Sequence, residues 1–132
     1  MKITADTNVL VRAMIGDDEQ QSALAQAELA AAELVAIALP SLCELVWVLS
    51  QGYKVASDEI ADAVRRLTNA ANVVVNRPAV EAGLALLDAG GDFADGVIAY
   101  EGRWLGGETF VSFDTKAVNR LTAQSKAARL LA

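Results

Sequence analysis

The sequence predicts an α/β domain whose mainly parallel sheet is covered by helices on both faces. Short apolar segments alternate with longer helix-forming segments, which is typical of parallel strands joined by helical crossovers. The 132 residues, of which 54% are hydrophobic, suit one domain with a substantial core. No repeat, linker or block of like charges interrupts the chain, so we expect a single domain over residues 1–132.

Short apolar runs mark the predicted strands. Four runs are clear, including the β-branched residues 73–75, and a weak fifth lies near the end of the chain. The predicted strands cover residues 3–5, 35–39, 73–75, 109–113 and 129–131.

Helix-forming residues fill the segments between these strands. Pro40 and Pro78 suit the first turn of a helix, Ser57 is a good N-cap, and glycines at 52, 90–91 and 106–107 suit helix ends. The predicted helices cover residues 7–16, 17–34, 40–51, 58–70, 78–89, 94–105 and a segment from residue 115.

The predicted helix over residues 17–34 is rich in Ala, Gln, Glu and Leu, which are strong helix formers. Leu24, Ala27, Ala31 and Leu34 have helical spacing, so we expect them to form its packed face. The acidic residues 17–19 are interpreted as its favourable first turn.

The residue counts exclude several kinds of active site. The chain has no histidine, which excludes catalytic triads with an imidazole base and the zinc sites that depend on imidazole. Its single cysteine, Cys43, cannot form an internal disulfide or a thiolate cluster, and this suits a reducing compartment. Any metal would therefore be bound by oxygen atoms.

The formal net charge of −6, taken alone, disfavours a nucleic-acid partner. However, a carboxylate cluster that binds a cation carries negative charge where the metal cancels it. Residues 1–6 lack the apolar stretch of a signal peptide, and the longest uncharged apolar stretch, residues 34–43, is too short to span a membrane. We therefore expect a cytoplasmic protein with no membrane partner.

Acidic residues follow the predicted strands or lie near the starts of helices. Asp6 follows the first strand, Asp114 follows the fourth, Glu44 lies one turn into a helix, and Asp92 and Asp95 bracket the start of another. Parallel strands place such positions at one edge of the sheet, where ligands bind, so we expect these carboxylates to be able to meet there. Asp6, Asp92 and Asp114 also stand at N-cap positions, and capping is the alternative role of each.

Glu44 has no such alternative, because its neighbours within residues 42–49 are apolar and predict a largely buried helix. An unpaired buried carboxylate is strongly unfavourable. Asp95 likewise precedes an apolar helical face. A shared divalent cation would neutralise both side chains, and a donor set made only of oxygen favours Mg²⁺ or Mn²⁺.

Together these motifs resemble the PIN-domain ribonucleases, and most closely the VapC-type toxins of type II toxin–antitoxin systems. The resemblance implies about five parallel strands and an Mg²⁺- or Mn²⁺-dependent endoribonuclease that cuts single-stranded regions of RNA and is inhibited by a cognate antitoxin. It rests on four motifs: Asp6-Thr7-Asn8-Val9-Leu10-Val11, Leu42-Cys43-Glu44-Leu45, Asp92-Phe93-Ala94-Asp95-Gly96-Val97-Ile98-Ala99 and Ser112-Phe113-Asp114.

The resemblance also implies roles for individual residues. The family's catalytic, metal-binding quartet of acids matches Asp6, Glu44, Asp95 and Asp114, with Asp6 and Asp95 as the expected direct ligands. Asp92 matches an additional acid found in part of the family, and its role stays open between a cap, a hydrogen-bond partner of a ligand and a ligand. Thr7, Asn8 and Ser112 are expected to hydrogen-bond to the ligands.

Such a site needs no histidine, because water activated by the metal attacks the phosphodiester in line. We therefore expect products with 5′-phosphate and 3′-hydroxyl ends. Arg12 and Lys116, each close in sequence to a site acid, are the predicted phosphate contacts. Trp47 and Trp104 are interpreted as core or interface residues.

An apolar, Ala-rich domain of this size also suggests a homodimer, with an antitoxin peptide bound in a groove. Two other functions remain open. One is a non-catalytic PIN-like scaffold for protein interactions. The other is an Mg²⁺-dependent phosphoryl-transfer domain, although Asp6-Thr7-Asn8 lacks the second acid of an Asp-x-Asp motif.

Overall fold

Five short strands form two parallel sheets in the computed structural model, which describes residues 1–132. In the first sheet, β1 (Lys2–Thr4), β2 (Leu34–Ala36) and β3 (Val73–Val74) pair in that order. In the second sheet, β4 (Phe110–Ser112) pairs with β5 (Ala128–Leu130). Every strand pairing is parallel, which agrees with the prediction.

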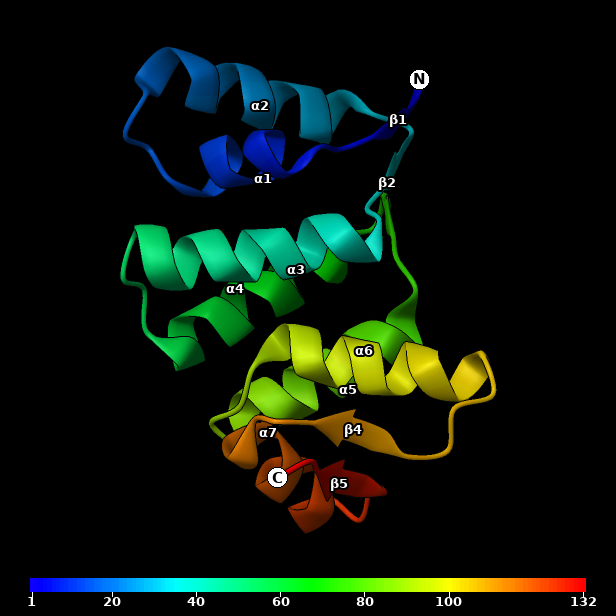
Figure 1. Cartoon of the computed structure of the whole chain (residues 1–132). Helices are drawn as coiled ribbons and strands as arrows, with labels where there is room; N and C mark the ends of the chain where they lie inside the picture. The colour runs from blue at the N-terminus through cyan, green and yellow to red at the C-terminus, as the bar shows by residue number, and fades with distance from the viewer. The chain divides into compact units, whose positions relative to one another are not determined.

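The chain divides into two compact units, residues 1–76 and residues 77–132, each containing one of the sheets (Figure 1). The alternation of strands and helices confirms the predicted α/β class, with the five strands shared between the units as three and two. The first unit contains α1 (Thr7–Met14), α2 (Glu19–Ala31), α3 (Leu39–Trp47), the π-helical segment η1 (Val48–Gly52) and α4 (Ser57–Thr68). The second contains α5 (Arg77–Asp88), α6 (Phe93–Trp104) and α7 (Thr115–Ala123).

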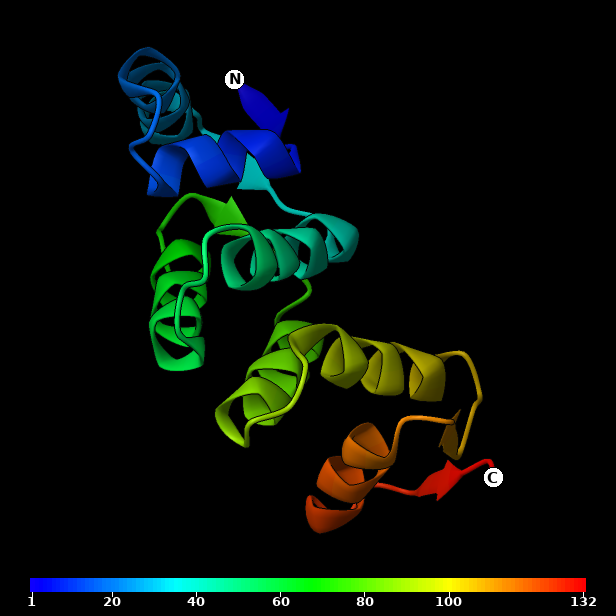
Figure 2. The same ribbon diagram turned by 60° about the vertical axis from the view of Figure 1, so that its left-hand side comes forward.

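The core of the first unit is built from the apolar sides of its helices and its central strand. Leu10 of α1, Val35 of β2, Leu42 and Leu45 of α3 and Val64 of α4 have no exposed surface. Figures 1 and 2 both show α1 and α2 side by side. This packing holds α1 in place, and with it the N-cap residue Asp6, two residues after β1.

The packed face of α2 differs from the predicted one. Its buried residues are Ser22 and Ala25, whereas Leu24 is 65% exposed and Ala27 and Ala31 are also exposed. Small apolar residues are spread around the whole helix, so its sequence has no distinct apolar stripe. Helical spacing alone therefore could not identify the side that packs.

Helix ends in the second unit follow the predicted glycines. Gly90 and Gly106 have φ angles of 87° and 102°, and they lie just after α5 and α6. In each case the following glycine donates its N–H to a carbonyl near the helix end, Gly91 to Leu86 at 2.8 Å and Gly107 to Gly102 at 2.8 Å. These are Schellman caps, which need a left-handed residue and favour glycine there.

The predicted cap of α4 is wrong by one residue. Ala56 is the N-cap and makes no side-chain hydrogen bond, while Ser57 is the first residue of the helix. The Asp58 carboxylate accepts a hydrogen bond from the Glu59 N–H at 3.0 Å instead. An acidic first turn therefore offsets the missing side-chain cap.

Helices α5 and α6 lie against each other in both ribbon views (Figures 1 and 2). Their approach is close because Gly96 of α6 faces the backbone of α5: an added Cβ would lie 2.5 Å from the Ala82 carbonyl oxygen. Phe93 and Val97 of α6 are buried beside Gly83 of α5. This contact fixes the start of α6, which carries Asp92 and Asp95.

None of the helices combines the length and apolar character needed to cross a membrane.

Candidate acidic site

Asp6 and Glu44 line the same cavity of the first unit, which has a volume of about 320 Å³. Asp6 lies two residues after β1 and is the N-cap of α1, while Glu44 comes from α3. Asn8, Arg12 and Tyr53 also line this cavity. The first unit therefore brings together the two acids predicted from its sequence, with polar and cationic neighbours.

Glu44 is exposed, so the prediction that it is buried is wrong. Leu42, Leu45 and Val46 form the buried side of α3, whereas Glu44 lies on the same side as Trp47, which is 63% exposed. The apolar residues of α3 lie on both sides of the helix, because Trp47 is exposed while Leu42, Leu45 and Val46 face the core. The apolar run therefore did not show on which side Glu44 lies. Burial therefore gives Glu44 no need for a cation.

The capping role weighed for three of the acids is confirmed. One carboxylate oxygen of Asp6 accepts the Thr7 N–H at 2.8 Å. The Oδ1 atom of Asp92 accepts the N–H groups of residues 94 and 95 at 2.7 and 3.3 Å, and that of Asp114 accepts those of residues 116 and 117 at 3.0 and 3.2 Å. In all three, Oδ2 accepts no hydrogen bond, so capping leaves an oxygen for another partner.

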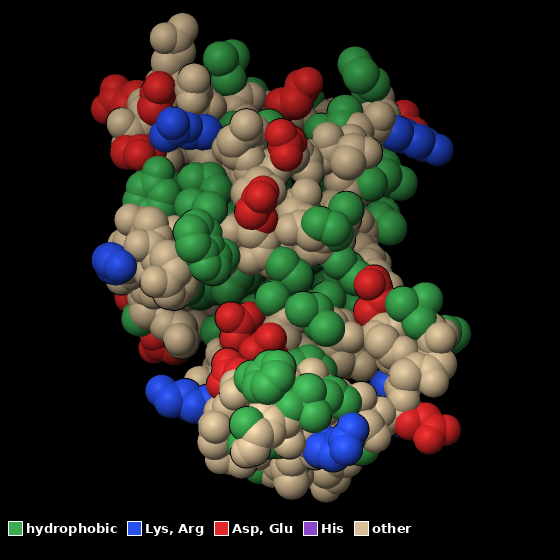
Figure 3. Space-filling model, in the orientation of Figure 1, with side chains coloured by type: hydrophobic (Ala, Val, Ile, Leu, Met, Phe, Trp, Pro, Cys, Tyr) green, Lys and Arg blue, Asp and Glu red, His purple; other side chains and the backbone are tan.

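Asp95 has the most perturbed environment among the predicted site acids. It lies in the first turn of α6 and is partly buried. Burial raises the pKa of Asp95, and the nearby carboxylates of Asp92 and Asp114 raise that pKa further. Figure 3 shows acidic side chains gathered where α6 begins. The second unit therefore contains an acidic cluster whose charge a bound cation would relieve.

The donor chemistry of these residues fits a hard divalent cation. All the candidate donors are carboxylate oxygens, which Mg²⁺ and Mn²⁺ prefer, and Mg²⁺ commonly takes only one or two direct carboxylates beside its waters. Within neither unit do three acidic side chains stand close enough to enclose an ion by themselves. Water and substrate oxygens would therefore have to complete the coordination.

The residues expected to hydrogen-bond to the acids contact them mainly through the backbone. The Ser112 hydroxyl accepts the backbone N–H of Asp114 at 2.9 Å and so fixes the turn that leads into α7. Thr7 is buried and donates its backbone N–H to Asp6. Asn8 is exposed at the cavity, and the Lys116 side chain is exposed beside Asp114.

A hydrogen-bond network that no local sequence pattern indicates borders the first cavity. Asp17 accepts hydrogen bonds from Arg12 Nη1 at 2.9 Å and from the Tyr53 hydroxyl at 2.9 Å. The Tyr53 bond, and then the Arg12 charge, lower the pKa of Asp17. Tyr53 and Asp17 are 36 residues apart, so no local pattern could pair them.

This network also corrects the interpretation of residues 17–19 as a first helical turn. Helix α2 begins at Glu19, and Asp18 is its N-cap, accepting the Gln21 N–H at 3.0 Å. Asp17 lies outside the helix and binds Arg12 instead. Arg12, a predicted phosphate contact, is therefore already paired with a carboxylate.

A comparison with protein families gives the sequence context of these acids. Residues 3–123 match the PIN domain family, a span that covers most of the chain. The chain belongs to the PIN domain family. PIN domains have a nuclease-type fold and are generally metal-dependent nucleases, so the resemblance inferred from the four motifs is confirmed for the family. No curated protein matches the sequence.

The acids of this PIN domain all lie inside the matched span. Asp6 and Glu44 come from the first unit, and Asp92, Asp95 and Asp114 from the second. Tyr53, which lines the first cavity, and Asp17, to which it donates a hydrogen bond, were not predicted from the sequence. Neither carries a signal in its own neighbourhood, since the contact that involves them depends on the tertiary fold.

Proposed function

We propose that this PIN domain is a metal-dependent endoribonuclease, the toxin of a type II toxin–antitoxin pair, that cleaves single-stranded regions of RNA. The observation that carries the proposal is the placement of the partly buried Asp95 beside Asp92 and Asp114, within a family match over residues 3–123. A carboxylate held among like charges is the electrostatic environment expected of a cation site. In a nuclease fold, a cation bound there would take part in phosphodiester cleavage.

We propose that Asp6, Glu44, Asp95 and Asp114 bind the cation, with Asp6 and Asp95 as direct ligands. When bound, Mg²⁺ or Mn²⁺ would activate a water molecule for attack and offset the charge that develops on the phosphoryl oxygens. The protein itself would hold these carboxylates in place before the cation binds. The N-cap bonds orient Asp6 and Asp114 through Oδ1 and leave Oδ2 open.

Asp92 fits the role of a cap that also adds negative charge. Both its hydrogen bonds go to backbone N–H groups at the start of α6, and one of these belongs to Asp95. Asp92 therefore orients the turn that carries Asp95 and strengthens its attraction for a cation. We propose this positioning role for Asp92 rather than direct ligation.

RNA needs cationic contacts, because the chain as a whole is acidic. Arg12 lines the cavity that contains Asp6 and Glu44, and its pairing with Asp17 uses only part of the guanidinium fork. Lys116 lies in the first turn of α7, two residues after Asp114. We propose both as phosphate contacts.

Several large apolar side chains are exposed, and this exposure supports the proposal that the protein binds protein partners. Trp104, Leu105 and Phe113 are 76%, 83% and 76% exposed, and Trp47 is 63% exposed. Large exposed apolar groups commonly mark interaction surfaces. We propose that a homodimer and a cognate antitoxin cover such surfaces, and that the protein acts in the cytoplasm, where Cys43 stays reduced.

The test is cleavage of a pool of labelled RNAs by the purified protein in Mg²⁺ or Mn²⁺, against EDTA. We expect cutting that needs the metal, that Asp6→Asn abolishes, and that leaves 5′-phosphate and 3′-hydroxyl ends. Asp62→Asn, an exposed acid on α4, is the matched control and should cut like the wild type. Absence of cutting in every metal, with any bound partner removed, would favour the non-catalytic scaffold instead.

A further inference from the structure

A second and larger cavity lies wholly within the second unit, and none of the predicted site acids lines it. Its volume is about 770 Å³, within the range of small-molecule sites. Its walls come from Ala82 and Ala85 of α5, from α6 between Gly96 and Trp104, from residues 107–111 and from the α7–β5 connection. Asp92, Asp95 and Asp114 are not among the lining residues.

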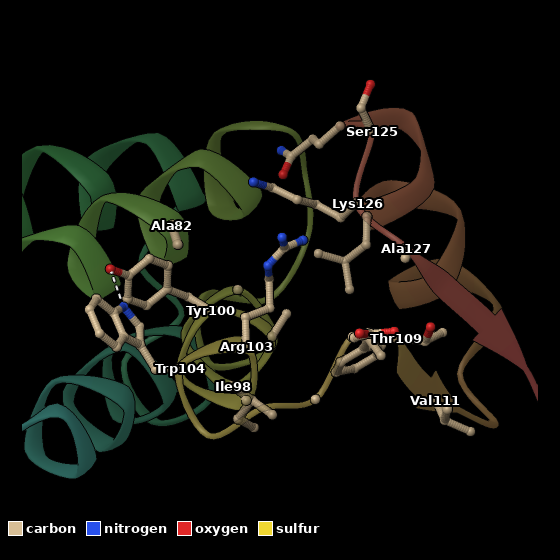
Figure 4. A pocket seen from close by; sticks show the side chains of 18 of the residues that line it. Ala82, Ile98, Tyr100, Arg103, Trp104, Thr109, Val111, Ser125, Lys126 and Ala127 are labelled. Atoms are coloured by element: carbon tan, nitrogen blue, oxygen red, sulfur yellow. Dashed lines mark hydrogen bonds between the residues drawn. The ribbon is translucent and has the colours of Figure 1, made fainter.

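Two cations point into this cavity from different elements. Figure 4 shows Arg103 of α6 and Lys126 of the α7–β5 connection directed into the same space. Neither side chain forms a salt bridge, and Glu108, which also lines the cavity, pairs with neither. Two unpaired cations that converge in a chain of net charge −6 indicate a site for an anion.

The backbone that presents Lys126 adopts an unfavourable conformation. Ser125 has a φ of 62°, in the left-handed region, and the Lys126 N–H then bonds to the Leu121 carbonyl at 2.9 Å. This Schellman cap usually has glycine where Ser125 stands, as α5 and α6 do. The turn therefore holds Lys126 at the rim despite the conformational strain.

Much of the remaining lining is apolar or aromatic. It includes Ala82, Ala85, Ala99 and Phe110, with Thr109 and Gln124 as polar neighbours. At the rim, the Trp104 indole N–H donates to the Tyr100 hydroxyl at 2.6 Å, a pair visible in Figure 4. Flat apolar rings stack well on aromatic side chains, whatever their hydrogen-bonding pattern.

We propose that this cavity binds a nucleoside phosphate, with its phosphate on Arg103 and Lys126 and its base against the Tyr100–Trp104 pair. Cations supply the charge-assisted contacts to phosphate oxygens, and the aromatic pair offers a base a flat surface on which to stack. The same chemistry is present in a free nucleotide and in one nucleotide of an RNA strand. Binding of an RNA strand at this cavity rests on the proposed nuclease function, whereas binding of a free nucleotide does not.

The experiment is a fluorescence titration in EDTA, where the acidic site holds no metal and RNA is not cut. A Trp47→Phe background leaves Trp104 as the only indole, because the chain has two tryptophans. The two probes are adenosine 5′-monophosphate and a short single-stranded oligoribonucleotide. We expect quenching by one or both probes, and quenching by the oligonucleotide alone would assign the site to the RNA strand.

The variants identify the site. Arg103→Ala and Lys126→Ala should each weaken binding about tenfold or more and lower the salt dependence of the binding constant by about one counterion. Arg129→Ala removes an exposed cation of β5 that does not line the cavity, and its affinity should equal that of the background protein. Circular dichroism melts of each variant establish that a loss of binding is not a loss of fold.

Binding of neither probe, or equal binding after both cations are removed, would overturn the proposal. This outcome is separate from a failure of the nuclease proposal, because the titration needs neither metal nor cleavage. Conversely, metal-dependent cutting in a protein that binds no nucleotide here would leave the nuclease function intact.

Discussion

At the scale of single residues, Asp95 lies in an environment that disfavours its charged form. Its carboxylate is partly buried beside Asp92 and Asp114, and all three effects raise the pKa of Asp95. A raised carboxylate pKa means that the ionised form is unfavourable in the folded protein relative to the unfolded chain. Without a cation, the folded state therefore loses stability when Asp95 ionises.

The raised pKa of Asp95 predicts how the stability of an Asp95→Asn variant depends on pH. The folded state binds more protons than the unfolded chain between the ordinary Asp pKa, about 3.9, and the raised pKa of Asp95, so stability falls as pH rises through that window. In EDTA, Asp95→Asn should therefore be more stable than the wild type at neutral pH, and the difference should shrink as pH falls through the window. Urea unfolding across pH measures it; a pH-independent difference would contradict the account.

The residue scale also shows what sequence could and could not reveal. Capping by Asp6, Asp92 and Asp114 was weighed correctly, because a cap depends on the next few residues alone. Exposure of Glu44 and the Asp17–Tyr53 bond were not predicted. Both depend on which helix side packs and on contacts between distant segments, which local sequence does not encode.

At the scale of elements, the contact between α5 and α6 depends on glycine at one position. A Cβ on Gly96 would meet the Ala82 carbonyl oxygen at 2.5 Å, whereas one on Gly102, in the same helix, would meet nothing within 4 Å. Gly96→Ala should lower the free energy of unfolding by about 1–3 kcal/mol. Gly102→Ala should raise it by up to about 1 kcal/mol, because alanine favours helix. Equal effects in thermal melts would contradict the packing shown here.

The cap after α7 predicts a stabilising substitution. Ser125 occupies the left-handed position that glycine occupies after α5 and α6. Ser125→Gly should raise the free energy of unfolding by about 0.5–1 kcal/mol, because it removes the strain that a side chain suffers there. Denaturant unfolding measures the change, and a clear loss of stability would mean that Ser125 is not in this conformation.

The positions of most helices and strands were predictable, because they depend on patterns within a few neighbouring residues. The strands and the helix ends at Gly90 and Gly106 followed from apolar runs and glycine placement. The packed face of α2 was predicted wrongly, since an Ala-rich helix lacks a single apolar stripe. The π-helical turn η1 had no signal in the apolar spacing of residues 40–51.

At the scale of the whole molecule, the exposed apolar side chains predict self-association. Trp104, Leu105 and Phe113 are more than three-quarters exposed. Light scattering coupled to gel filtration should show a dimer at micromolar concentration, and Trp104→Ser should leave the fold intact, whatever its effect on the dimer. A wild-type monomer under these conditions would count against the dimer.

The α/β class could be predicted from alternation alone, because each crossover repeats the same local pattern. The pairing of strands into sheets of three and two could not, since strands of two or three residues carry no register signal. The sequence likewise identified which acids to test but not their surroundings. The electrostatic coupling of Asp95 to Asp92 and Asp114 became visible only in the three-dimensional structure.

The central claim is that the acids found in the sequence bind the cation on which RNA cleavage depends. Calorimetric titration of Mn²⁺ into the metal-free protein tests it most directly, with Asp6→Asn, Asp95→Asn and the control Asp62→Asn. We expect both site variants to bind Mn²⁺ at least about tenfold more weakly than the wild type and Asp62→Asn to be unchanged. Undiminished Mn²⁺ binding by Asp6→Asn and Asp95→Asn would contradict the account.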